Sequence, residues 1–200
     1  METIRGRKSL ELDMNGFTER LANYDRVLLD LGTGDGRYVH TLAREHPSRF
    51  VIGVDACREN LRKHSQTKLP NMLFIIASAQ SLPRELHRLA SHITINFPWG
   101  SLLESLLAGD ANLMRGLESV SRSAAALDLR LNSGALTEAG TSLEAGADKI
   151  YHNLLRAGWQ TAPPALMNAS ALRCFPSTWA KRLACGRDPR AVAVSGRLPV

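Results

Sequence analysis

The sequence predicts an α/β fold built around a mostly parallel sheet, and three observations support this. Short apolar runs alternate with segments of helical periodicity along most of the chain, which is the pattern of strand–helix–strand units. The first run, Val27–Leu31, leads into glycine at every second position, Gly32, Gly34 and Gly36. The second run, Phe50–Asp55, ends in a carboxylate. A glycine-rich loop after one strand and an acid at the tip of the next are typical of Rossmann-like nucleotide sites.

The remaining elements follow from local patterns, because short apolar runs predict strands and longer amphipathic stretches predict helices. We expect strands at Val27–Leu31, Phe50–Asp55, Met72–Ala77, Ile93–Phe97, Ala124–Leu131 and Ala191–Arg197, with one more after Trp159. We expect helices at Tyr38–His46, Arg58–Thr67, Leu82–Leu89, Ser101–Leu107, Leu113–Val120 and Ser142–Ala157. Pro47 stops the first of these helices and Gly158 caps the last.

The chain length favours one domain. A chain of 200 residues is enough for one hydrophobic core and small for two, so we expect a single domain over residues 1–200. Residues 1–25 form an N-terminal extension, in which Thr3–Leu12 has the pattern of a short hairpin. We expect the Gly- and Ser-containing stretch Ser133–Thr141 to be a loop within this domain.

The composition excludes several classes of protein. No apolar run approaches the roughly 18 residues that a membrane helix needs, and the N-terminus lacks the apolar core of a signal peptide. We therefore expect a cytoplasmic protein without a membrane partner. The three cysteines and six histidines show no metal-ligand spacing, so we expect reduced thiols and no metal site.

The charge of the chain favours a polyanionic partner. The formal net charge is +6 and the isoelectric point is about 9.6. A basic surface that only keeps a protein soluble gives the same composition, so the position of the charges matters more. Arg5, Arg7 and Lys8 open the chain, a second group of basic residues follows the second expected strand, and a third group lies near the C-terminus.

The glycine loop differs from that of a dehydrogenase, whose third glycine stands three residues after the second. Here the step from Gly34 to Gly36 is two residues. This spacing, with Asp30 before it, suits a ligand without a pyrophosphate, such as S-adenosylmethionine; the alternative is a glycine turn that binds nothing. Asp30 would face the methionine amino group or order the loop. Asp55 would accept hydrogen bonds from both ribose hydroxyls, because a carboxylate has two acceptor oxygens.

The loop after the third expected strand, Ala77–Gln80, lies where this architecture places a group near the adenine amine. Gln80 would accept from that amine through its side-chain carbonyl. The alternative is a surface glutamine without such a role. We interpret Asp35, within the glycine loop, as a solvated acid.

Two tryptophans suggest a site for a planar base. Trp99 follows the fourth expected strand, where ligands bind in open α/β sheets, and Pro98 stiffens its turn. Trp179 stands next to a pair of basic residues. Two indoles could sandwich a flipped base, with each stack contributing on the order of 1–3 kcal/mol, while the cations meet phosphates. A single tryptophan at a strand end is more often a core residue, and we assign Trp159 to the core.

Three segments resemble a known family. Asp30–Gly36, Phe97–Leu103 and Ser177–Leu183 are similar, in this order, to motifs of the aminoglycoside-resistance 16S rRNA methyltransferases, which modify N1 of adenine 1408 in the decoding site. Many methyltransferases share the first motif, and the other two are far more specific. The resemblance implies a seven-stranded, Rossmann-like class I S-adenosylmethionine-dependent methyltransferase with helices on both faces of the sheet. It also implies the 30S subunit as the substrate, and we expect a monomer.

The resemblance implies roles for individual residues. Trp99 and Trp179 would hold the flipped adenine, with Ser177 nearby and with Phe97 and Pro98 shaping the pocket. The expected cofactor contacts are Asp30, Gly32, Thr33, Gly34, Gly36, Asp55, Ala56, Ala79, Gln80, Asn96 and Ser101. The expected RNA contacts are Arg58, Arg62, Lys63, Lys68, Lys181, Arg182, Arg187 and Arg190. The family usually has glutamate at the position of Gln80.

Three other functions stay open at this point. Asn96–Trp99 also resembles part of a segment of tRNA guanine-N7 methyltransferases, although an Asp-Pro pair of that segment is missing. A small-molecule methyltransferase would have the same glycine loop but would not need the cationic C-terminal segment. A homologue that has lost activity would keep the fold, with glutamine at position 80 as its mark.

Overall fold

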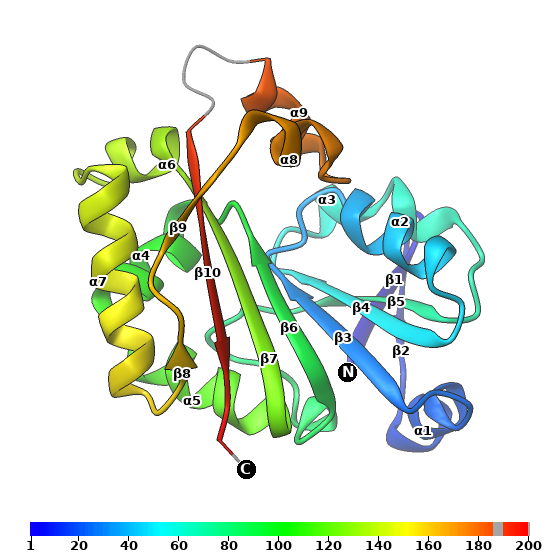
Figure 1. Cartoon of the computed structure of the whole chain (residues 1–200). Coiled ribbons are helices and arrows are strands. Elements are labelled where there is room, and N and C mark those ends of the chain that lie inside the picture. Colours follow the sequence, from blue (N-terminus) through cyan, green and yellow to red (C-terminus); the bar gives the residue numbers. More distant parts are fainter. Residues whose placement is uncertain (186–189, 200) are drawn as a thin grey trace.

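The computed structural model describes residues 1–185 and 190–199, and over these ranges it forms one ten-stranded sheet with helices on its faces (Figure 1). The strands are β1 (Glu2–Arg5), β2 (Lys8–Glu11), β3 (Arg26–Leu31), β4 (Arg49–Asp55), β5 (Met72–Ile76), β6 (Ala90–Asn96), β7 (Ser121–Asn132), β8 (Gln160–Thr161), β9 (Ala165–Met167) and β10 (Ala191–Arg197). Their order is β2-β1-β5-β4-β3-β6-β7-β10-β8, and β9 pairs with β10. Strands β5, β4, β3, β6 and β7 are parallel, and the others add antiparallel pairs at the two edges.

The helices connect these strands and form two layers. They are α1 (Met14–Leu21), α2 (Arg37–Glu45), α3 (Arg58–Leu61), α4 (Gly100–Ala108), α5 (Ala111–Val120), α6 (Ser133–Glu138), α7 (Leu143–Arg156), α8 (Ala169–Cys174) and α9 (Thr178–Ala184), with 3-10 turns at His64–Gln66 and Arg84–Leu86. Figure 1 shows α2 and α3 on one side of the sheet and α4, α5 and α7 on the other, with α8 and α9 above the carboxyl ends of the parallel strands.

The alternation of side chains along each strand produces two apolar clusters, one on each face. Leu28 of β3 packs with Val39 of α2, whereas the next residue, Leu29, packs in the larger cluster with Leu106 of α4 and Ile150 of α7. These side chains are almost fully buried. Since both faces of the parallel strands are covered, their near-continuous apolar sequences are explained.

The predicted fold class is confirmed, but the predicted number of strands is wrong. The sheet has ten strands where we expected seven. The hairpin β1–β2 is part of the sheet, because Thr3 of β1 pairs with Ile75 of β5. After Trp159 the chain forms two short strands, β8 and β9, which pair with different parts of β10. Edge strands of two or three residues carry too little apolar pattern to be predicted from sequence.

Three local predictions also need correction. The stretch expected to be a loop at Ser133–Thr141 contains helix α6, whose first turn is capped by the side chain of Asn132 accepting from the Ala135 N–H at 2.8 Å. The expected helix Arg58–Thr67 is divided into α3 and a 3-10 turn. The expected helix Leu82–Leu89 is reduced to a single 3-10 turn.

Further properties of the described residues concern membrane-spanning helices, disulfides and metal-binding groups. Over the described ranges, no helix combines the length and the apolar character needed to cross a bilayer. Cys57, Cys174 and Cys185 are exposed and have free thiols. The same ranges contain no group of three or more His, Cys, Asp or Glu side chains that could hold a metal ion.

The loop between β3 and α2 needs glycine for two different reasons. Gly34 and Gly36 both have positive φ, +59° and +74°, a region that other residues adopt only with strain. Beside Gly34 there is open space, whereas a Cβ on Gly36 would lie 2.5 Å from Cε1 of the buried Phe74 ring. The close approach of α2 to β5 therefore requires glycine at position 36.

We expect Gly36→Ala to lower the free energy of unfolding by more than the roughly 1–3 kcal/mol that positive φ alone costs. Gly140→Ala is the matched control, since Gly140 has φ +78° and a Cβ added there would meet no heavy atom within 4 Å. Urea unfolding of both variants separates backbone strain from the clash with Phe74. Equal destabilisation by the two substitutions would contradict this explanation.

Candidate active site

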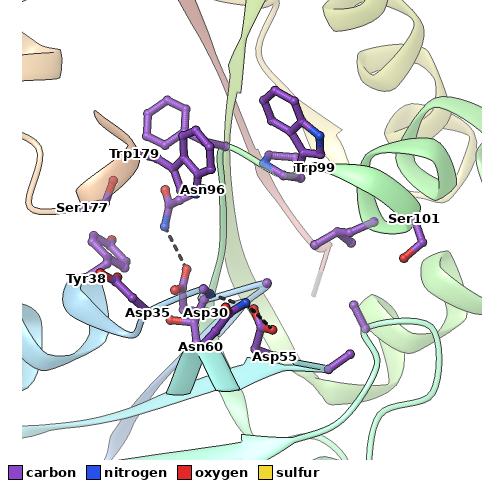
Figure 2. Close-up of a pocket in the computed structure, with 18 of the residues that line it drawn as sticks. Asp30, Asp35, Tyr38, Asp55, Asn60, Asn96, Trp99, Ser101, Ser177 and Trp179 are labelled. Atoms are coloured by element: carbon purple, nitrogen blue, oxygen red, sulfur yellow. Dashed lines mark hydrogen bonds between the residues drawn. The ribbon is translucent and has the colours of Figure 1, made fainter. Parts of the chain in front are cut away.

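A cavity of about 410 Å³ opens at the carboxyl ends of the parallel strands. It lies where the chain crosses from one side of β3 to the other, between β3 and β6, which is the switch point where open α/β sheets bind ligands. Figure 2 shows the carboxylates of Asp30 and Asp55 at one end of this cavity and the indoles of Trp99 and Trp179 at the other.

The structure brings nearly all the expected base and cofactor contacts to this cavity. The expected residues that line it are Asp30, Gly32, Thr33, Gly34, Asp55, Ala56, Ala79, Gln80, Asn96, Phe97, Pro98, Trp99, Ser101, Ser177 and Trp179. Gly36 is not among the lining residues of the described chain, and it packs against Phe74 instead. Residues that line the cavity without having been expected there include Asp35, Tyr38, Asn60 and Thr178.

Asp30 is a buried acid at the floor of the cavity. Its side chain is 1% exposed, and its Oδ1 accepts hydrogen bonds from Thr94 Oγ1 at 2.7 Å and from Asn96 Nδ2 at 2.8 Å. Burial raises the pKa of Asp30 to about 6, against the opposing effect of these hydrogen bonds and of the nearby Arg130 charge. A carboxylate accepts about four hydrogen bonds, so Asp30 retains capacity for a cationic ligand group.

Arg130 supports Asp30 through Asn96, and sequence reasoning missed it. Arg130 Nη1 donates to Asn96 Oδ1 at 2.9 Å, which fixes the amide so that its NH₂ points to Asp30. The register of the sheet creates this network, because Asp30 pairs with Thr94 and Asn96 pairs with Arg130. No local motif marks Arg130, and only the order of β3, β6 and β7 could have found it.

Asp55 holds the glycine loop. Its Oδ2 accepts from the Gly34 N–H at 2.8 Å, and its Oδ1 accepts from the Cys57 N–H at 2.8 Å and from Asn60 Nδ2 at 3.4 Å. The carboxylate therefore sits at the tip of β4 in a fixed orientation, next to the loop that closes this side of the cavity (Figure 2).

Gln80 is held in place rather than free on the surface. Its Nε2 donates to Ser101 O at 3.2 Å and to Ser105 Oγ at 3.0 Å, and its Oε1 accepts from Ser78 Oγ. These contacts orient the amide, and a carbonyl oxygen with one partner still has a second lone pair. Gln80 lines the cavity and is half-buried, which favours a role in the site over a surface glutamine without one.

Trp99 and Trp179 lie face to face at the mouth of the cavity. Their ring centroids are 5.6 Å apart, the planes differ by 17°, and each side chain is 42% exposed. Trp99 Nε1 donates to Glu138 Oε1 at 3.2 Å, and the Arg182 guanidinium lies 5.3 Å from the Trp179 ring centroid. The third tryptophan, Trp159, is 1% exposed, which confirms its assignment to the core.

The turn that carries Trp99 is strained. Phe97 has φ +54°, which is rare for a residue with a side chain, and its N–H donates to Arg130 O at 2.7 Å. Pro98 has a fixed φ of its own and also restricts the backbone of Phe97, the residue before it. Phe97 is 3% exposed and packs edge-on against Phe175, with 5.7 Å between centroids. Tertiary packing thus holds the turn in the conformation that presents Trp99.

The segment that carries Trp179 has a capped helix and is attached to the rest of the protein at two points. Ser177 caps α9, its Oγ accepting from the Ala180 N–H at 3.0 Å. Thr178 Oγ1 donates to Asp35 Oδ2 at 2.7 Å, so Asp35, which we expected to be only a solvated acid, is half-buried and also holds α9. Phe175 stacks on Tyr38 with 5.0 Å between centroids.

The expected RNA contacts fall into separate places. Arg58, Arg62 and Lys63 lie on and just after α3, and Lys68 lies in the linker before β5. Lys181 and Arg182 lie in the last turn of α9. Arg190 precedes β10, where its Nη2 donates to Ser133 Oγ at 3.3 Å and its Nη1 lies 3.8 Å from Glu144 Oε1. Arg187 lies outside the described residues.

Comparisons with known proteins match this chain to one family. The family model "NpmA: 16S rRNA (adenine(1408)-N(1))-methyltransferase" matches residues 2–198. A curated 16S rRNA (adenine(1408)-N(1))-methyltransferase from Escherichia coli is 32% identical, over 99% of each chain.

Solved structures agree with this match over the whole fold. The crystal structure of the 16S rRNA methyltransferase KamB has a TM-score of 0.89 at 29% identity and covers 100% of both chains. A point mutant of the 16S rRNA (adenine(1408)-N(1))-methyltransferase from Catenulisporales acidiphilia, solved with its cosubstrate SAM, has a TM-score of 0.88 at 25% identity, over 100% of this chain and 97% of that one. The chain therefore belongs to the 16S rRNA (adenine(1408)-N(1))-methyltransferase family.

Proposed function

We propose that this chain transfers a methyl group from S-adenosylmethionine to N1 of adenine 1408 of the 16S rRNA, within the 30S subunit, and so confers resistance to aminoglycosides. The observation that carries the proposal is the pair of exposed, parallel indoles at the mouth of a cavity with two fixed carboxylates at its other end. An enzyme that modifies a base inside folded RNA must hold that base outside its stack, and aromatic faces do this.

The residues of the cavity suit S-adenosylmethionine. The buried carboxylate of Asp30 suits the ammonium of the methionine part, and Asp55 at the strand tip, which already accepts three hydrogen bonds, keeps room for one from a ribose hydroxyl. The oriented Gln80 lies where the adenine amine would find an acceptor. Ala79 and Leu102 add apolar surface beside it. A volume of about 410 Å³ falls within the usual range of ligand cavities, roughly 300–1,000 Å³.

The two indoles must separate to admit the base. A planar ring between two others needs about 3.5 Å on each side, or roughly 7 Å between the outer planes. The centroids of Trp99 and Trp179 are 5.6 Å apart, and the separation of the ring planes cannot exceed this distance, so the planes would have to part by at least about 1.5 Å.

Methyl transfer to adenine N1 requires little from the protein except the correct placement of the two reactants. When bound, S-adenosylmethionine supplies a methyl group activated by a sulfonium, which adenine N1 accepts with its own lone pair, without a general base. The chain contributes by holding N1 in line and by excluding water. Positive charge develops on the base, and the faces of Trp99 and Trp179 stabilise it by cation–π attraction.

Docking on the 30S subunit would use the basic residues around the cavity. Lys181 and Arg182 lie on the same short helix as Trp179, so phosphates next to the flipped base would meet them first. Arg58, Arg62 and Lys63 would meet RNA farther from the base. We propose that the protein acts as a monomer on cytoplasmic ribosomes. A small-molecule methyltransferase would need neither the cations nor the exposed indoles.

Primer extension across the decoding site tests this function. We expect a stop at adenine 1408 only when 30S subunits, protein and S-adenosylmethionine are all present. Substitution of either indole by alanine should reduce kcat/KM for 30S methylation by about 5- to 150-fold, since one base stack contributes about 1–3 kcal/mol. Cofactor affinity, measured by calorimetry, should stay unchanged.

The control for this prediction is phenylalanine at the same positions. Trp99→Phe and Trp179→Phe keep an aromatic face and should retain more activity than the alanine variants. Normal methylation by both alanine variants would reject the base clamp. A wild-type protein that gives no stop at adenine 1408 would reject the proposed function itself.

The raised pKa of Asp30 predicts a pH dependence of cofactor binding. The pKa is about 6 in the free protein, and an ammonium group binds the ionised carboxylate. Affinity should therefore be constant above pH 7 and fall by roughly tenfold per pH unit below pH 6, as the carboxylate takes up its proton. Calorimetry between pH 5 and 8 measures this, and a flat profile for the wild type would contradict it.

Two variants assign the transition to Asp30. Asp30→Asn should bind more weakly at pH 7.5 and show no transition near pH 6. Arg130→Gln should move the transition to higher pH, because the positive charge of Arg130 lowers the pKa of Asp30. A shift of the transition without a general loss of binding points to the charge of Arg130 rather than to its hydrogen bond with Asn96.

A further inference from the structure

A second cleft lies at the edge of the sheet formed by β2 and β1, opposite the edge that ends in β8. It has a volume of about 370 Å³ and is bounded by the hairpin β1–β2, by α1 and by the linker before β5. Its floor is apolar and includes Ile4, Met72 and Phe74. It shares no lining residue with the active-site cavity, and Lys68 is the one described lining residue that we expected to contact RNA.

Three cations from different elements surround this cleft. Arg5 comes from β1, Arg20 from α1 and Lys68 from the linker, and none of the described lining residues is acidic. Arg20 Nη2 donates to Met72 O at 3.4 Å. Within the described part of the chain, none of the three forms an ion pair with a carboxylate.

The charges around the cleft favour the binding of an anion. Burial lowers the pKa of Arg20, and the positive charge of Arg5 lowers it further. Two like charges held close together raise the free energy of the unbound cleft, and an anion between them would relieve this repulsion. Thr67 adds a hydroxyl group to the lining, and hydroxyls donate readily to phosphate oxygens.

The hairpin continues the basic surface that begins on α3. Arg58 Nη2 donates to Arg7 O at 2.9 Å, and the Gly6 N–H donates to Ser65 Oγ at 2.9 Å. These bonds fasten the hairpin turn to the segment that also carries Arg62 and Lys63. The cations of the hairpin and those of α3 therefore belong to one rigid surface, and the same long polyanion can reach both.

We propose that the hairpin-edge cleft, formed around Arg5, Arg20 and Lys68, binds the ribose–phosphate backbone of the 16S rRNA at a place remote from the methylated base. The cations would contact phosphates, and the apolar floor would lie under a ribose. This inference rests on the proposed function, since that function supplies a folded RNA as the partner. It extends the RNA-binding surface to the N-terminal hairpin, outside the segments with sequence motifs.

Binding to 30S subunits at several salt concentrations tests the proposal. The variant is Arg5→Gln/Arg20→Gln in the full chain, with S-adenosylhomocysteine present. Each phosphate contact that is lost should lower the slope of log affinity against log salt by about 0.7–1. We expect the double variant to lose about two such contacts, and to bind about tenfold more weakly at roughly 150 mM salt because each contact contributes a few-fold.

The matched control is Arg115→Gln/Lys149→Gln, which removes the same charge from α5 and α7 on the other side of the sheet. Its salt slope should remain that of the wild type. Equal slopes for the two double variants would overturn the proposal. So would a weaker affinity of the Arg5→Gln/Arg20→Gln protein for S-adenosylhomocysteine, or a lower midpoint of urea unfolding, because the loss would then reflect the fold.

Inorganic phosphate distinguishes a free-anion site from an RNA site. If millimolar phosphate raises the unfolding temperature of the wild type but not of Arg5→Gln/Arg20→Gln, while 30S binding is the same for both, the cleft binds small anions and the proposal fails. Primer extension on the wild type keeps the two proposals separate. A normal stop at adenine 1408 with unchanged salt slopes rejects the cleft alone, and the absence of a stop rejects the proposed function.

Discussion

The buried carboxylate of Asp30 is the constraint on which the site depends. Burying an ionised carboxylate costs free energy unless hydrogen bonds and an opposite charge stabilise it. Here both come from neighbouring strands. Thr94 and Asn96 donate to it directly, and Arg130 acts through Asn96. The network exists because β3, β6 and β7 are adjacent and in register, so the sheet itself sets the ionisation of the group expected to hold the cofactor.

The same arginine connects the two ends of the cavity. The Arg130 guanidinium lies 4.6 Å from the ring centroid of Phe175, which also stacks on Tyr38. Phe175 stands at the start of the segment that carries Trp179, and Thr178 of that segment is bonded to Asp35 of the glycine loop. The segment that holds Trp179 is therefore attached to residues beside the expected cofactor site. This arrangement suits a reaction in which placement supplies most of the catalysis.

The basic residues at the active-site cavity and those at the hairpin-edge cleft suit different kinds of RNA contact. Around the cavity, a few cations next to Trp179 accompany an aromatic pair, which suits recognition of one base. At the hairpin edge, cations surround an apolar floor, which suits a backbone contact that carries no sequence information. An enzyme that reads the shape of folded RNA needs both kinds of contact, since one base provides little discrimination.

The sequence by itself determined the parallel strands, the glycine loop, both strand-tip carboxylates and the turn before Trp99, because these depend on residues close together in the chain. The sequence also predicts that Trp99 and Trp179 act as a pair, and the structure brings the two rings together. The tertiary structure alone decided that Arg130 supports Asp30 and that Asp35 holds α9. It also decided that the hairpin and the short strands β8 and β9 enlarge the sheet to ten strands. Local backbone preferences act over a few residues and are visible in sequence. Contacts between distant segments depend on strand order and packing, which no short pattern encodes.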